Sequence, residues 1–287
     1  MNAPLRVLDL FSGIGGFSLG LERTGGFKTV AFCEIEPFPR RVLAKHWPEV
    51  PCYDDVRTLT AERLRADGIC VDVICGGFPC QDISNAGRGE GIAGQRSGLW
   101  SQIARLAGDL RPDFIIVENV SALLGRGLGT VLGDLASLGY DAEWHCIPAS
   151  AVGAPHQRDR LWLVAYPNSS ERGAQRCARQ RLAWSERLLQ WQEGASGLGA
   201  SRQNVAVAMR DGSQGSVGSE LRGLQSRERQ SLGGSSHWLS EPDVGRVANG
   251  VPGRVDRLKS LGNAVVPQIP ELIGNAILAS LAQREAA

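Results

Sequence analysis

The sequence lacks paired cysteines, membrane-length apolar runs and a leader-like N-terminus, and each absence excludes a class of protein. Its 7 cysteines are scattered and none stands in a C-x-x-C pair, which excludes a disulfide framework and a thiolate zinc site. No apolar run approaches the roughly 20 residues that a membrane helix needs, and no basic region precedes an apolar one at the start. We therefore expect a cytoplasmic protein with reduced thiols, no metal and no membrane contact.

Lysine is scarce in the later middle of the chain, where arginine supplies the positive charge. Residues 166–260 hold 14 Lys+Arg against 9 Asp+Glu, and Lys259 is the one lysine among them. Arginine is suited to bidentate contacts with phosphate and guanine, although a solvated surface explains the same count. The stretch is also rich in Gly, Ser and Gln. It therefore fits either a flexible surface insertion or a small recognition module.

The first 165 residues alternate between short β-branched runs and helical patterns. Strands are expected at 6–11, 29–33, 71–75, 113–117, 141–147 and 161–165, and helices at 37–46, 61–66, 99–110 and 131–138. Such alternation predicts an α/β fold with a doubly wound, mostly parallel sheet. A final helix with apolar residues from Ile269 to Leu281 is expected to pack against it. The predicted division is therefore 1–165, an irregular recognition region at 166–257, and a returning segment at 258–287.

A strand at 71–75 runs directly into a glycine-rich loop that carries Cys80. Gly76 and Gly77 let the backbone turn and approach a ligand closely, and Pro79 fixes φ just before the cysteine. Cys80 would then lie at the carboxyl edge of the sheet, where open α/β sheets bind ligands. A free cysteine is commonly a small buried apolar residue, so the loop alone leaves both interpretations open.

Two further features follow the first two strands. The turn SGIGG at 12–16 joins the first strand to a helix, which lets a cofactor approach the backbone near a helix N-terminus. Glu34 ends the second strand, where an acidic residue holds ribose hydroxyls in nucleotide-binding α/β folds. The spacing is not G-x-G-x-x-G and no Walker lysine follows. A long polar loop at 81–96 is of a length that is commonly functional.

Taken in order, these segments resemble the DNA cytosine-5 methyltransferase family of bacterial or phage type. The resemblance covers 1–165 and about 258–287, and it implies a Rossmann-like methyltransferase fold and S-adenosylmethionine as cofactor. It rests on DLFSGIGG at 9–16 for the cofactor motif, GFPCQ at 77–81 for the nucleophile, ENV at 118–120 for the acid, QRDR at 157–160 for the arginine motif, and GNAV at 262–265 for the last motif.

The resemblance also assigns catalytic roles. Cys80 would add to C6 of a flipped-out cytosine, which makes C5 nucleophilic. Glu118 would stabilise the electron density that reaches N3, and Arg160 would contact the base oxygen and hold that carboxyl. Arg158 and Gln81 complete the implied catalytic set. The base that removes the C5 proton is not assigned.

The resemblance implies a cofactor site and a DNA surface as well. The implied cofactor residues are Phe11, Ser12, Gly13, Gly15, Glu34, Ile35, Asp55, Val56, Pro79, Leu99, Asn263 and Val265. Ser84, Arg88 and Arg96, on a loop that closes over DNA, are the implied DNA contacts. Expected partners are double-stranded DNA and a cognate restriction endonuclease, in restriction-modification or phage protection. Methylation of RNA and a catalytically weak DNA-binding relative are the alternatives. Residues 244–257 fit the family's ninth motif poorly, so the target sequence is not deducible.

Overall fold

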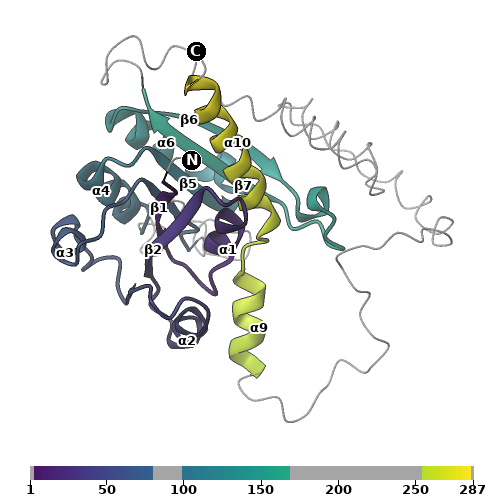
Figure 1. The fold of residues 1–287 in the computed structure, drawn as a ribbon. Helices are drawn as coiled ribbons and strands as arrows, with labels where there is room; N and C mark the ends of the chain where they lie inside the picture. Colours follow the sequence, from purple (N-terminus) through teal and green to yellow (C-terminus); the bar gives the residue numbers. More distant parts are fainter. Residues whose placement is uncertain (1–2, 80–98, 169–253, 286–287) are drawn as a thin grey trace, which may run out of the picture.

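A seven-stranded sheet forms the centre of the described chain, which in this computed structural model comprises residues 3–79, 99–168 and 254–285. The strand order is β3-β2-β1-β4-β5-β7-β6 (Figure 1). The strands are β1 (Leu5–Leu10), β2 (Phe27–Cys33), β3 (Cys52–Tyr53), β4 (Val73–Gly76), β5 (Phe114–Val120), β6 (Tyr140–Ile147) and β7 (Arg160–Pro167). Strands β1 to β5 are parallel, whereas β7 pairs antiparallel with β5 and β6. The predicted doubly wound, mostly parallel sheet is confirmed.

Helices cover both faces of the sheet (Figure 1). They are α1 (Gly16–Arg23), α2 (Pro37–His46), α3 (Ala61–Ala66), α4 (Trp100–Leu110), α5 (Leu123–Arg126), α6 (Leu128–Ser137), α9 (Arg254–Asn263) and α10 (Gln268–Glu285), with a 3-10 turn η3 (Ala149–Val152). Helices α3, α4 and α6 contribute Leu64, Ile103 and Leu135 to one core. Helices α1 and α10 contribute Leu21 and Ile273 to the core on the other face.

Strand β1 shows why these residues form the centre of the sheet. Successive side chains of a strand point to opposite faces, and accordingly Val7 lies in the α1/α10 core whereas Leu8 and Leu10 lie in the opposite core. A run that is apolar on both faces is typical of a strand buried in a parallel sheet. Asp9 breaks the apolar run, yet its side chain is fully buried.

Helix α10 returns the end of the chain to the first part of the fold. Ile269, Ile273 and Ile277 are buried against the sheet and α1, which confirms the predicted core-packing helix. Within the described ranges, Val255–Gln283 is the one stretch long and apolar enough to cross a membrane by length and composition alone. Three isoleucines of this stretch are buried in the domain, whereas Val255, Leu258 and Leu261 are exposed, and 33% of its apolar window is buried.

Some elements extend beyond the predicted bounds, and others have no counterpart in the prediction. The apolar run that predicts β5 ends at Val117, but the strand continues to Val120 because Glu118 pairs with Trp162 and Val120 with Arg160 on β7. Helices α5 and α9 and the short strand β3 were not predicted. The division at 166–257 stays a prediction, because residues 169–253 lie outside those described.

Candidate active site

The turn between β1 and α1 holds an uncommon backbone conformation. Phe11 has φ 54°, Gly13 has φ 53° and Gly15 has φ 85°, all in the left-handed region that glycine enters freely and phenylalanine rarely. Ser12 fixes the turn: its Oγ donates to Asp9 O at 2.6 Å and accepts from Cys33 N at 3.3 Å. The turn is therefore tied to the ends of both β1 and β2, and a strained non-glycine residue such as Phe11 marks a functional candidate.

Glu34 lies just after β2 and faces this turn. Its side chain is buried, its Oε2 accepts from Gly13 N at 2.8 Å, and its Oε1 accepts from Glu36 N at 2.7 Å. Each carboxylate oxygen has more than one acceptor site, so both retain capacity for a ligand hydroxyl. Glu36 is partly exposed and its Oε1 accepts from Lys259 Nζ at 3.0 Å. Of the two neighbouring carboxylates, Glu34 is the one directed at the glycine turn.

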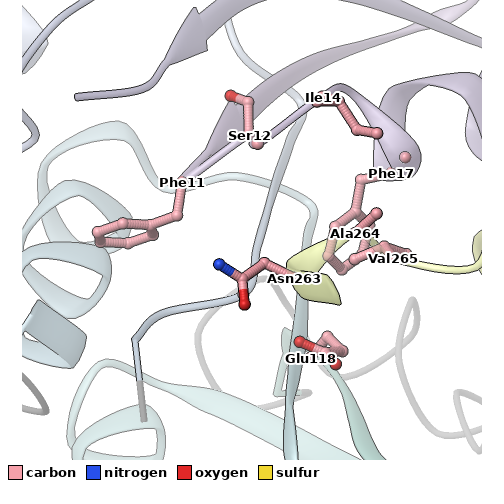
Figure 2. A pocket seen from close by; sticks show the side chains of 11 residues that line it. Phe11, Ser12, Ile14, Phe17, Glu118, Asn263, Ala264 and Val265 are labelled. Atoms are coloured by element: carbon pink, nitrogen blue, oxygen red, sulfur yellow. The ribbon is translucent and has the colours of Figure 1, made fainter. Parts of the chain in front are cut away.

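A pocket opens between this turn and the segment after α9 (Figure 2). Figure 2 shows the Asn263 side chain lying between Phe11 and Glu118. The pocket therefore brings together residues from four separate parts of the chain. Its lining consists of Phe11, Ser12, Gly13, Ile14, Gly16, Phe17, Gly77, Glu118, Asn263, Ala264 and Val265.

Glu118 and Arg160 form an ion pair at one side of this pocket. The Arg160 Nε donates to Glu118 Oε1 at 2.9 Å, and the two side chains are 25% and 14% exposed. The antiparallel register of β5 and β7 creates the pair, because Arg160 opposes Val120, which lies two residues beyond Glu118 and on the same face of the sheet. Burial raises the pKa of Glu118, while the charges of Arg160 and Arg158 oppose that rise. Glu118 is therefore easier to protonate than an exposed glutamate.

Gly77 leads the chain past this carboxyl group. A Cβ at Gly77 would lie 2.8 Å from Glu118 Oε2, so a side chain at this position would displace the acid. Glycine is thus required for the close approach of this segment to Glu118, and its predicted approach to a ligand stays a prediction. Gly77 directly follows the last residue of β4.

Several predicted site residues lie away from the pocket lining. Gly15 packs against Trp47, and Ile35 is exposed beyond Glu34. The Asp55 carboxylate accepts from Arg57 Nη2 at 2.7 Å. Val56, Pro79 and Leu99 are likewise outside the lining residues, and Val56 is buried in the core. Cys80, Gln81, Ser84, Arg88 and Arg96 fall outside the described residues.

Other lining residues were not predicted, namely Ile14, Gly16, Phe17, Gly77 and Ala264. All five stand beside or within the quoted motifs, so sequence proximity to those motifs was the available signal. Phe17 fits the apolar pattern of α1, and this pattern alone gives no indication that its ring also reaches a pocket. Its ring packs edge to face on Trp162, with centroids 5.4 Å apart.

This arrangement joins a concave site under a glycine turn to a buried, ion-paired acid. The first part suits a nucleotide-like ligand, since its turn precedes a helix N-terminus and a buried carboxylate faces it. The second part suits proton donation or charge stabilisation. The pocket therefore places a site that suits a nucleotide-like ligand beside a buried acid.

Comparison with known proteins identifies the class. Residues 5–193 match the family model of the C-5 cytosine-specific DNA methylases, and the chain belongs to this family. It is 38% identical over 169 residues to the type II methyltransferase M2.BsuMI of Bacillus subtilis (strain 168), covering 56% of this chain and 42% of that relative. It is 34% identical over 173 residues to the type II methyltransferase M.DsaV of Dactylococcopsis salina, covering 58% and 47%.

Among solved structures, the S. pombe Dnmt2 methyltransferase is 23% identical, with a TM-score of 0.48 over 57% of this chain and 50% of that one. The chain spans less than half of the length of the two curated relatives. What those relatives do as whole proteins therefore applies to this chain only as a proposal.

Proposed function

We propose that this chain transfers a methyl group from S-adenosylmethionine to C5 of a flipped-out cytosine in double-stranded DNA. The observation that carries the proposal is the common pocket of the glycine turn, Asn263 and Glu118, with Glu118 ion-paired to Arg160. Cytosine C5 methylation needs a methyl donor and an acid within reach of the same base. It also needs a thiol, and Cys80 directly follows the segment that passes Glu118.

The residues present fit S-adenosylmethionine. Gly16 and Val265 both line the pocket, and a Cβ at Gly16 would lie 2.7 Å from Val265 O, so the close approach of these two walls requires glycine. In the lining, Phe11 offers an aromatic face and Asn263 offers an amide. Glu34 is outside the lining residues but is bonded to Gly13 of the lining, and it offers carboxylate oxygens for ribose hydroxyls. When bound there, the cofactor supplies an electrophilic methyl group on a sulfonium centre.

The proposed chemistry assigns one task to each residue. The Cys80 thiolate adds to C6, and the electron pair of the C5–C6 double bond moves through the ring toward N3, where Glu118 donates a proton. C5 would then take the methyl group as the donor's carbon–sulfur bond breaks and S-adenosylhomocysteine leaves. A base removes the C5 proton, the electron pair of that C–H bond restores the C5–C6 double bond as the Cys80 thiolate leaves, and the N3 proton returns to Glu118. Arg160 orients Glu118 and reaches the base oxygen. The raised pKa of Glu118 favours the protonated form that the addition requires.

The biological setting is part of the proposal. The relatives named above are type II methyltransferases, which supports a role in restriction-modification or phage protection, in the cytoplasm and beside a cognate restriction endonuclease. We propose residues 166–257 as the target-recognition region because their arginines suit phosphate and guanine. Ser84, Arg88 and Arg96 are the proposed DNA contacts of the loop at 81–96.

Expression in a host without cytosine methylation, followed by bisulfite sequencing of its DNA, tests the proposal. We expect protected cytosines in one recurrent sequence context, and none with the variant Cys80→Ala at equal protein level. Protected cytosines in cellular RNA with unprotected DNA would instead support the RNA alternative. Protection of neither nucleic acid by the wild-type chain would contradict the proposed reaction.

A further inference from the structure

Arg158 lies near the acid pair, but its guanidinium is bonded to another part of the chain. Its Nη1 donates to Gly262 O at 2.6 Å and its Nη2 donates to Ala264 O at 2.8 Å. The two acceptors flank Asn263, whose side chain lies in the pocket (Figure 2). One planar group thus fixes the backbone on both sides of a single pocket residue.

The chemistry of the acceptors explains why arginine stands here. Gly262 is in the last turn of α9, where carbonyl oxygens have no intrahelical partner and carry the negative end of the helix dipole. Arginine has a fixed planar fork of donors and a permanent positive charge. It can bond the Gly262 carbonyl and the Ala264 carbonyl, just beyond the helix, at once, which a lysine ammonium on a flexible stem cannot do with the same geometry.

The backbone of Arg158 is itself unusual. Its φ of 40° lies in the left-handed region, which a non-glycine residue adopts at some cost in free energy. Arg160, two residues later, is instead bonded to Glu118. Within the segment 158–160, Arg158 therefore bonds the backbone on both sides of Asn263, and Arg160 bonds the acid Glu118.

We propose that Arg158 is a positioning residue for the methyl-donor pocket and acts through Asn263, an inference that rests on the proposed function. Arg160 in contrast acts on Glu118. The arginine motif then couples the two halves of the site, because a displacement of the turn at 158–160 moves the donor wall and the acid together.

Calorimetric titration of the full chain with S-adenosylhomocysteine tests this assignment without requiring turnover. We expect Arg158→Gln to raise the dissociation constant by about tenfold or more, since two charge-assisted hydrogen bonds are lost. Arg158→Lys should recover part of the affinity. The matched variant Arg160→Gln should leave the dissociation constant within about twofold of wild type while lowering kcat at saturating donor far more than Arg158→Gln does.

A double-variant cycle separates this role from a general structural one. The double variant carries both Arg158→Gln and Asn263→Ala. If Arg158 acts through Asn263, its dissociation constant for S-adenosylhomocysteine should be no higher than that of the weaker-binding single variant. Fully additive losses would overturn the inference, as would unchanged donor binding by both Arg158 variants. A wild-type chain that binds no S-adenosylhomocysteine would overturn the proposed function and this inference together, which distinguishes the two failures.

Discussion

Gly20 of α1 packs directly against Pro267 and Pro270 in the segment that follows α9. Replacing it therefore tests how the packing of this segment forms the donor pocket. A Cβ at Gly20 would lie 2.1 Å from Pro267 O and 2.9 Å from Pro270 Cβ. The first of these atoms is backbone at the start of α10, where it accepts from Glu271 N at 3.1 Å. The segment that carries Asn263 and Val265 would therefore have to move by roughly 1 Å before ordinary van der Waals distances return.

The magnitude follows from two opposing effects. Overpacking a tight contact costs about 1–3 kcal/mol, whereas alanine in a helix gains up to about 1 kcal/mol over glycine. We expect Gly20→Ala to lower the free energy of unfolding by on the order of 1–2 kcal/mol, which corresponds to a Tm lower by roughly 2–8 °C in a domain of this size. Donor affinity should fall as well, because the displaced segment lines the pocket.

Gly133 provides the matched control. It lies in α6, is exposed, and a Cβ there would meet nothing within 4 Å. Gly133→Ala should therefore raise Tm by a few degrees through helix propensity alone. Thermal unfolding and titration with S-adenosylhomocysteine measure both effects. A Gly20→Ala chain with wild-type Tm and wild-type donor affinity would refute the packing argument.

Two further predictions concern buried acids. Glu118→Gln should lower kcat by about 10²–10³-fold. It should also remove the fall in activity that occurs as pH rises through the raised pKa of Glu118. If the variant keeps this fall in activity, another group causes it. Burial raises the pKa of Asp9 from 3.8 to about 7, so its contribution to stability is fully present below about pH 4 and is lost as pH rises to 7. Urea unfolding across that window should show a slope that Asp9→Asn reduces, and an equal slope in both proteins would contradict the burial argument.

Much of the fold is predictable because its signals are local. The run at 114–117 is apolar and β-branched enough to predict a buried strand, and the helix at 61–66 has the predicted bounds. The alternation of such elements then places the ends of β1, β2, β4 and β5 at one edge. That is why Phe11, Glu34 and Glu118 could be selected from sequence before any pairing was known.

The remaining features depend on partners far away in the chain. Strand β5 extends to Val120 because of pairing with β7, and no local pattern around Glu118 contains that information. Likewise the hydrogen bonds of Arg158 reach carbonyls 104 and 106 residues away. The motif resemblance predicted that Arg158 and Asn263 both matter, but it gave no indication that one holds the other.

The partner of the Asp55 carboxylate could not be predicted from the sequence, for a different reason. The resemblance implies that it contacts the cofactor, but its carboxylate is bonded to both the backbone and the guanidinium of Arg57, two residues later. These bonds lower the pKa of Asp55. A short Asp–Arg spacing is visible in the sequence, but which of two partners the carboxylate takes depends on the local backbone turn.

Trapping of the covalent intermediate tests the central claim most directly. A duplex with 5-fluorocytosine at the target position carries fluorine where the C5 proton would be removed, so the chain stays bonded to C6 after methyl transfer. With S-adenosylmethionine present, we expect a denaturation-resistant complex whose mass equals protein plus methylated duplex, formed by wild type and absent with Cys80→Ala. An equal adduct with Cys80→Ala, or no adduct with a duplex that the wild-type chain methylates in its unfluorinated form, would contradict the proposed mechanism.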